Sequence, residues 1–276
     1  MDRFPSETGT EETILTLCEL GLADHEAVSQ YAETNLLPRL SQEGNRRSLE
    51  DSGSALPRGT TAAPHLRRFV RDRVLRLLVR AGFGQRPRVR QMMSDVIEEW
   101  SKFLQRAAKE ELFVKRRGML QPREGVLLPT SEAYDAICFY DWQSHEEETV
   151  AETVTNLFAW AEDNRWPEGL LAEEPYRDHL FRLLSKQEYL SRPERMLYEL
   201  ELSARLGITQ KPAATCWMLE ELEARQDGDG FFWFDVEGPS SLPWYFPLEK
   251  GATADDFTAE WTFRGLLIFS FLGYDV

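Results

Sequence analysis

Apolar residues recur at three- or four-residue intervals along most of this chain, and the strict alternation that indicates a β-strand is scarce. Residues 65–81 carry apolar side chains on one face and arginines on the other, which predicts a surface helix. The sequence as a whole predicts an all-α protein of about ten helices. The other helices are expected over 11–40 (two, divided near Gly21), 93–108, 130–142, 150–161, 175–184, 191–206, 213–226 and 253–273.

Two stretches lack this periodicity. Residues 41–64 are rich in Ser, Gly, Thr and Arg and hold few apolar residues, so they predict a flexible connector. Residues 118–129 predict a loop, which leads into a helix-start signal at Thr130. We therefore expect an N-terminal helical region at 1–40, the connector at 41–64 and one larger helical domain at 65–276.

Four of the predicted helices end in the pattern apolar-Gly-apolar, centred on Gly21, Gly82, Gly207 and Gly273. Glycine at this position adopts the left-handed conformation that stops a helix, and the next apolar residue packs back onto the last turn. The glycines are 61, 125 and 66 residues apart. A helical-hairpin repeat with one degenerate copy near Trp142 would produce this spacing, and chance recurrence of a common helix stop is the alternative.

A turn rich in glycine and aspartate, residues 227–230, lies between a predicted helix and the aromatic run 231–234. Glycine lets the backbone reverse sharply, and the aromatic side chains can fill the space between neighbouring hairpins. The register excludes a calcium loop, because with Gly230 at the sixth position Arg225 would be first and Val236 twelfth. The turn therefore predicts a structural role in stacking hairpins.

Residues 217–273 resemble a repeat of the terpenoid-cyclase and protein-prenyltransferase superfamily. The QW-type motif of that superfamily has Gln, then Gly four residues on, then an aromatic residue two further, and Gln226, Gly230 and Phe232 match this spacing. A weaker copy begins at Gln121. The resemblance implies an α/α toroid-like array of helical hairpins around a cavity that accepts isoprenoids in relatives.

The resemblance also suggests residues that could act as a catalytic general acid. Class II terpenoid cyclases protonate an alkene with the central Asp of an Asp-x-Asp-Asp-Thr-Ala motif, and residues 253–259 read Thr-Ala-Asp-Asp-Phe-Thr-Ala. Asp255 and Asp256 are therefore the candidate catalytic residues. The alternative is structural: Thr253 caps the final helix, and the two aspartates lie in its first turn, where the helix dipole favours negative charge.

Aromatic residues cluster in the same region and could form a wall that stabilises a carbocation, although a protein core uses the same residues. We therefore expect the chain to bind a hydrophobic, isoprenoid-like small molecule in a central cavity. If it is an enzyme, it would convert this molecule by acid catalysis, as a cyclase-like isomerase or lyase, or as a transferase. A sugar hydrolase on the same fold would need two opposed carboxylates across a cleft. The candidate substrate-binding residues are Trp233, Trp244, Tyr245, Phe257 and Trp261.

The sequence predicts neither a metal nor a cofactor. The zinc of protein prenyltransferases needs Asp, Cys and His from nearby repeats, and no Cys follows the glycine turn. Gly-rich phosphate loops, nucleophile elbows and dinucleotide fingerprints are also missing from the sequence. The histidines and cysteines are isolated, which favours solvent-exposed or core positions: His25, His65, His145, His179, Cys18, Cys138 and Cys216.

Charge is unevenly distributed. The formal net charge of -15 argues against nucleic-acid binding, yet residues 65–90 carry nine arginines and only one acid, Asp72. Arg71, Arg76 and Arg80 are candidates for binding an anion or an acidic partner, and a non-catalytic helical repeat scaffold is the alternative function. Arginines on such a face are also often solvated or paired with the chain's own acids.

No apolar run reaches the length of a membrane span, and the N-terminal residues are polar and acidic, unlike an export signal. We therefore expect a cytoplasmic protein without a membrane span. The oligomeric state stays open.

Overall fold

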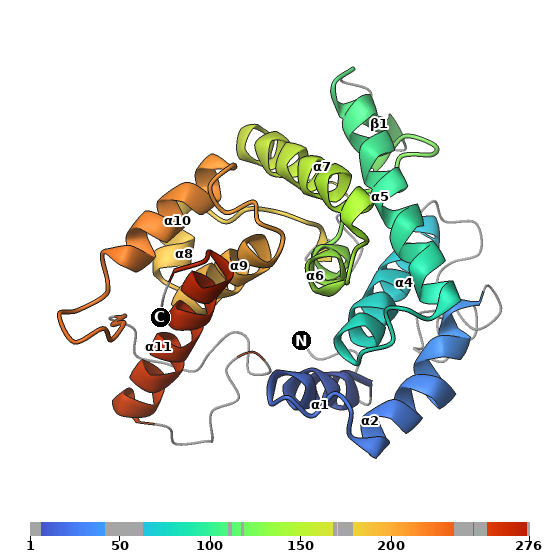
Figure 1. The fold of residues 1–276 in the computed structure, drawn as a ribbon. Helices are drawn as coiled ribbons and strands as arrows, with labels where there is room; N and C mark the ends of the chain where they lie inside the picture. The colour runs from blue at the N-terminus through green and yellow to red at the C-terminus, as the bar shows by residue number, and fades with distance from the viewer. Residues whose placement is uncertain are drawn as a thin grey trace. The chain divides into compact units, whose positions relative to one another are not determined.

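The computed structural model describes residues 7–41, 63–109, 112–116, 119–167, 170, 179–234, 245 and 253–274. These residues are mostly helical, which confirms the all-α class (Figure 1). The chain divides into two compact units. Unit 1 comprises residues 1–143 and 163–182, and unit 2 comprises residues 144–162 and 183–276.

These units have other boundaries than the domains expected from composition, and those domains stay a prediction. The helices within residues 7–40 pack against residues 63–80, so the expected N-terminal region is part of unit 1. The expected domain at 65–276 is divided between the two units. Of the expected connector at 41–64, the structure describes Ser41 and the helical residues 63–64, and the rest lies outside the described residues.

Unit 1 is built around one helix, α4 (Ala63–Arg80). Its other helices are α1 (Glu7–Glu19), α2 (Glu26–Tyr31), the π-helical turn η1 (Ala32–Leu36), the 3₁₀ turn η2 (Leu37–Leu40), α5 (Pro87–Ala107) and α6 (Ser131–Phe139). Helix α4 contacts α1, η1, η2, α5 and α6. Proline is the first residue of α5, where its missing N–H costs no hydrogen bond.

The prediction that residues 65–81 form a surface helix is wrong, because α4 is buried on more than its apolar face. Arg68, Asp72 and Arg80 are buried together with Leu75. The periodicity correctly separated apolar from charged residues. It could not show that α1, α5 and α6 supply carboxylates that cover the charged face.

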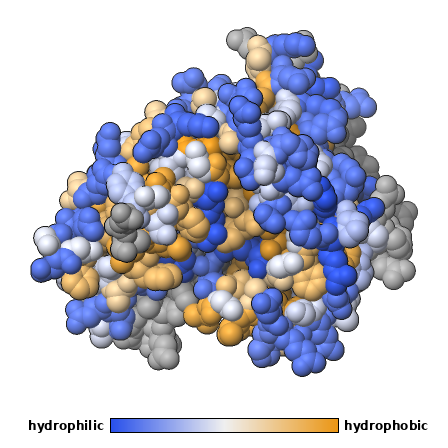
Figure 2. All heavy atoms as spheres, in the orientation of Figure 1, coloured by the Kyte–Doolittle hydropathy of each residue, from blue (hydrophilic) through white to orange (hydrophobic). Residues whose placement is uncertain are grey.

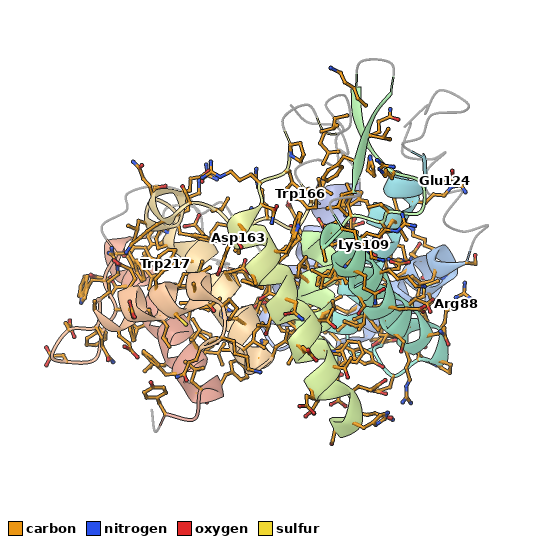
Figure 3. All side chains as sticks on the ribbon, turned by 90° about the horizontal axis from the view of Figure 1, so that it is seen from above. Arg88, Lys109, Glu124, Asp163, Trp166 and Trp217 are labelled. Atoms are coloured by element: carbon orange, nitrogen blue, oxygen red, sulfur yellow. The ribbon has the colours of Figure 1, made fainter. Side chains whose placement is uncertain are left out.

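A two-stranded hairpin follows α5, where the sequence predicted no strand. Strands β1 (Phe113–Arg116) and β2 (Met119–Pro122) pair antiparallel, with the first residue of each opposite the last of the other. Four-residue strands are too short to show a reliable alternation. The indole of Trp166 packs against the rings of Phe103 and Phe113 at 6.1 and 6.3 Å between centroids, which ties the hairpin to α5 (Figure 3).

Unit 2 is built around α9. Its helices are α7 (Ser144–Asp163, of which the last residue falls in unit 1), α8 (Lys186–Leu190), α9 (Pro193–Arg205), α10 (Ala213–Glu223) and α11 (Ala254–Phe271). Helix α9 contacts α8, α10 and α11. The carboxylate of Glu162, near the end of α7, accepts a 2.6 Å hydrogen bond from the backbone N–H of Ala214 in the first turn of α10. Trp217 of α10 lies 5.9 Å from Tyr189 of α8, measured between ring centroids (Figure 3).

The helix predicted at 175–184 is wrong over its described part. Residues 180–185 are not helical, and Leu180 instead pairs with Thr130 in an isolated antiparallel bridge. Residues 175–178 lie outside the described residues. Tertiary pairing therefore overrides the local apolar spacing in this segment.

The four predicted helix stops are confirmed. Gly21, Gly82, Gly207 and Gly273 all have φ between 63° and 81°. At each stop, the backbone N–H of the glycine bonds to the carbonyl three residues before it, and the next N–H reaches the carbonyl five residues before its own residue. This is the Schellman pattern that satisfies the last carbonyls of a helix.

The two units share a further arrangement around these stops. In each unit, the two helices that end in such a glycine pack against one another: α1 with α4, and α9 with α11. The residues two positions before the glycines meet. Arg80 forms an ion pair with Glu19 in unit 1, and in unit 2 the guanidinium of Arg205 lies 4.4 Å from the ring centre of Phe271.

Candidate functional site

The turn at residues 227–230 is held together by Asp227. One carboxylate oxygen of Asp227 accepts from the backbone N–H groups of Asp229 and Phe231, both at 2.9 Å, and the other accepts from Trp233 Nε1 at 2.6 Å. These hydrogen bonds, that from Trp233 foremost, lower the pKa of Asp227. Its carboxylate is therefore occupied in closing the turn.

The three residues with the spacing Gln, Gly four residues on and an aromatic two further come together as one clamp. Gln226 pairs with Phe232 in an isolated antiparallel bridge, and Gln226 Nε2 donates to the carbonyl of Gly230 at 3.4 Å. Gly230 has a φ of 89°, which a residue with a side chain rarely adopts. The motif therefore orients the aromatic residues that follow it.

Phe232 is the aromatic residue that the clamp directs inward. It is fully buried, its N–H donates to Thr262 Oγ1 at 3.2 Å, and its ring lies 5.7 Å from that of Phe269. Gly265 of α11 is the contact point, because a Cβ there would lie only 2.7 Å from Phe232 Cε2. Phe232 therefore fills the space against α11, and packing between stacked hairpins stays a prediction.

Large apolar side chains nevertheless remain at the surface of unit 2. The residues on either side of Phe232 point outward, and α11 and its last turn expose three more aromatic rings. Hydrophobic residues reach the surface over this part of the chain (Figure 2). The exposed fraction is 40% to 55% for five residues: Phe231, Trp233, Phe263, Phe271 and Tyr274.

The structure separates the predicted substrate-binding residues. Trp233 is exposed, whereas Tyr245 is fully buried and its hydroxyl donates to Glu201 at 2.9 Å. Phe257 and Trp261 lie together on α11, 5.9 Å apart between ring centroids. Trp244 lies outside the described residues.

The two candidate catalytic aspartates lie in the exposed first turn of α11. Thr253 Oγ1 accepts from the backbone N–H of Asp256, and Asp256 Oδ2 accepts from the backbone N–H of Thr253 at 2.7 Å, which completes a capping box. The backbone hydrogen bond from Thr253 lowers the pKa of Asp256, whereas a general acid needs a raised one. Asp255 lies beside this cap and is exposed.

A buried ionic cluster joins α9 to α11 in unit 2. Arg264 is buried and bonds Glu260 at 2.9 Å and the carbonyl of Tyr245 at 2.6 Å, with Glu201 at 3.4 Å. Glu201 also bonds Arg205 at 2.8 Å. The cluster contains two arginines and two glutamates, so its charges balance. Its ion pairs link α9 to α11 and hold the two helices in register.

The arginines of α4 are engaged inside unit 1. Arg71 bonds Glu99 of α5 through two nitrogens at 2.8 Å and its neighbour Asp72 at 2.7 Å, and Arg80 bonds Asp135 of α6 through two nitrogens at 3.1 Å. The sequence left open whether these arginines pair with the chain's own acids, and for Arg71 and Arg80 this pairing is present. Binding of an external anion by Arg71, Arg76 and Arg80 stays a prediction.

The same network contains groups with perturbed pKa values. Arg68 is buried, and burial lowers its pKa against the opposing effect of Asp72 and Glu99, which lie 3.5 and 3.2 Å away. Burial is the largest single effect on Glu99 and would raise its pKa, but the hydrogen bonds from Arg71 together with the charges of Arg68 and Arg71 lower this pKa overall. Thr130, the N-cap residue of α6, donates to Asp72 at 2.8 Å and so connects the network to α6.

A second pair lies at this end of α6. Glu132, in the first turn of α6, is buried, and its Oε1 lies 2.6 Å from Nδ1 of His179. Burial is the largest single effect on Glu132 and would raise its pKa, but the hydrogen bond from His179, the charge of His179 and the charge of Arg76 together lower this pKa. The carboxylate is therefore ionised at neutral pH.

The sequence analysis treated His179 as isolated and missed this pair. Forty-seven residues separate the two partners along the chain. The only local signal is the acidic residue two positions after the N-cap Thr130, which a helix dipole also explains. No spacing rule connects that position to a histidine 47 residues further along the chain.

Other site classes receive no support from the described residues. No group of three or more His, Cys, Asp or Glu side chains among them could hold a metal ion. No helix in this part of the chain is long and apolar enough to cross a membrane. Comparisons of the chain with protein-family models, curated proteins and solved structures found no match. Its function therefore has to be inferred from its own residues.

Proposed function

We propose that unit 2 binds a hydrophobic, isoprenoid-like small molecule, and that its hairpins follow the α/α toroid-like arrangement implied by the QW-type motif. The observation that carries this proposal is the set of large apolar side chains exposed on the glycine turn and on α11. Scattered single apolar residues are normal at a protein surface, whereas several on neighbouring elements are typical of a binding surface.

The clamp at Gln226 supports the same proposal. By directing Phe232 into the core, it forces the preceding and following residues, Phe231 and Trp233, to face solvent. The aromatic rings are rigid, so contact with an apolar ligand would cost little conformational entropy. Aromatic faces would also suit the alkene groups of an isoprenoid.

Binding without acid catalysis at α11 is the form of the proposal that the residues favour. Asp256 is committed to the helix cap, and its lowered pKa keeps it ionised at neutral pH. An ionised carboxylate cannot protonate an alkene. We therefore assign Asp256 no catalytic step, and acid catalysis by Asp255 stays a prediction.

A scaffold that captures an acidic partner through α4 is the weaker alternative. It requires Arg71 and Arg80 to leave carboxylates that they already bind. Replacing those internal pairs by external ones would leave Glu99 and Asp135 without their counter-charges, a buried arrangement that costs several kcal/mol.

The test uses farnesol as the probe, titrated into the full chain and followed by calorimetry. A double variant, Phe231→Ser with Phe263→Ser, should weaken binding by roughly tenfold or more. The matched control changes two exposed leucines of unit 1, Leu20→Ser with Leu22→Ser, and should leave the affinity unchanged. Undetectable binding of farnesol and of squalene by the unaltered protein, or equal weakening by the control, would refute the proposal.

A further inference from the structure

The Glu132–His179 pair of unit 1 is positioned by backbone contacts rather than by chance proximity. Phe181 N–H donates to the carbonyl of Pro129 at 2.9 Å, and Leu180 pairs with Thr130 in an antiparallel bridge. These bonds fix the segment that carries His179 alongside the start of α6, where Glu132 lies. The imidazole therefore meets the carboxylate in a defined orientation.

The hydrogen bond determines which imidazole nitrogen carries the proton. Ionised Glu132 can only accept, so Nδ1 of His179 must donate across the 2.6 Å contact. In the neutral ring, Nε2 is then the nitrogen that bears the lone pair. Nε2 forms no hydrogen bond with the described residues, and 38% of the His179 side chain is exposed.

Two further features favour reactivity at this nitrogen. The ring of Phe69 lies 4.1 Å from that of His179 between centroids and restrains its rotation. Glu132 Oε2 is buried and has no hydrogen-bond partner among the described residues, so the carboxylate is poorly solvated. A poorly solvated carboxylate stabilises positive charge on a bound imidazole more strongly than a hydrated one does.

We propose that His179 is a nucleophile toward activated carboxylic esters and that Glu132 is its positioning residue. Nε2 attacks the carbonyl carbon of the ester, the new N–C bond forms and the C–O bond to the alcohol breaks, with the electron pair leaving on the alkoxide or phenolate. The imidazole becomes positive, and Glu132 stabilises it through the proton on Nδ1. Water then attacks the acyl group, the N–C bond breaks, and the carboxylate product and two protons leave.

This activity is independent of ligand binding by unit 2, and its test uses p-nitrophenyl acetate with the full chain. The release of p-nitrophenolate is compared for the unaltered protein, His179→Asn and Glu132→Gln. Asparagine keeps a donor for Glu132 but lacks the nucleophile, and glutamine keeps an acceptor for His179 but lacks the charge. His145→Asn is the matched control, because His145 is exposed at the start of α7.

The rate lost in His179→Asn should exceed that lost in His145→Asn by at least about tenfold, a modest value for an oriented catalytic group. Glu132→Gln should lose most of the same rate while circular dichroism shows the helical content of the unaltered protein. Histidine nitrogen resonances should place the proton of neutral His179 on Nδ1. Equal losses in the two histidine variants, a Glu132→Gln rate equal to that of the unaltered protein, or a proton on Nε2 would overturn the proposal.

Discussion

Replacing Gly265 by alanine should destabilise unit 2, although the same change stabilises most helices. Gly265 lies inside α11, where alanine normally gains about 0.5–1 kcal/mol because it restricts the unfolded backbone. The new Cβ would, however, lie 2.7, 2.8 and 3.1 Å from three atoms of the Phe232 ring. Contacts below 3.0 Å force one of the partners to move.

The Phe232 ring has little room to give way. Its backbone is bonded to Thr262 and bridged to Gln226, and its side chain is fully buried against Phe269. Overpacking of this kind costs about 1–3 kcal/mol. After subtraction of the helix gain, Gly265→Ala should lower the free energy of unfolding by about 1–2 kcal/mol.

A double-mutant cycle with Phe232→Leu isolates the clash. Leucine lacks two of the three crowded ring atoms, Cε2 and Cζ, so in that background Gly265→Ala should regain most of the helix benefit and become stabilising by about 0.5 kcal/mol. The free energies of unfolding are measured by urea titration of the full chain, with circular dichroism as the signal. If two transitions are seen, the one that Phe232→Leu shifts is taken as that of unit 2. Ser270→Ala, at an exposed position of the same helix, is the control and should stabilise slightly.

The expected coupling energy is about 2 kcal/mol, with opposite signs of the Gly265→Ala effect in the two backgrounds. If Gly265→Ala stabilised the unaltered protein as Ser270→Ala does, the close packing of Phe232 on α11 would be refuted. If Gly265→Ala destabilised both backgrounds equally, its effect on the free energy of unfolding would not come from a clash with the Phe232 ring.

Three further predictions concern charges and caps. The folded-state pKa of Glu99 is depressed below its ordinary value of 4.5, so its stabilisation is complete above pH 4.5 and is lost as the pH falls through the folded value. Glu99→Gln should therefore flatten the decrease of the thermal midpoint of unit 1 below pH 4.5, and an unchanged slope would contradict this. Thr253→Ala should lower the free energy of unfolding of unit 2 by about 1 kcal/mol, because the N-cap of α11 is lost. Urea unfolding measures this change, and an unchanged free energy would show that the capping box does not stabilise unit 2. Arg80→Met should cost unit 1 about 3–5 kcal/mol because its partners stay buried and charged, while Arg86→Met, which breaks an exposed pair, should cost less than about 1 kcal/mol; similar losses would disprove the distinction.

Features governed by neighbouring residues were predictable from the sequence. The glycine stops use hydrogen bonds that span three to five residues, so the pattern around Gly207 is enough to predict one. The cap at Thr253 and the clamp at Gln226 are equally local, because their partners lie three to six residues away. Periodicity also correctly predicted the mostly helical class.

Predictions that depended on distant partners were wrong or incomplete. The spacing of residues 65–81 identified a charged face on α4, but its burial depends on Glu99, 28 residues from Arg71. The segment at 180–185 has helical spacing yet extends to pair with residues 129–131. The spacing of residues along one segment does not indicate which other elements will pack against that segment.

The sequence by itself determined where four helices stop at glycine, that Thr253 caps the last helix and which aromatic residues follow the glycine turn, because each depends on hydrogen bonds and sterics within a few residues. The tertiary structure alone decided that the arginines of α4 are paired inside unit 1, that Phe232 is buried while its neighbours Phe231 and Trp233 are exposed, and that His179 meets Glu132. These outcomes depend on contacts between residues 28 to 62 positions apart or on packing between helices. Burial then sets the strength of the electrostatic interactions that any function would use.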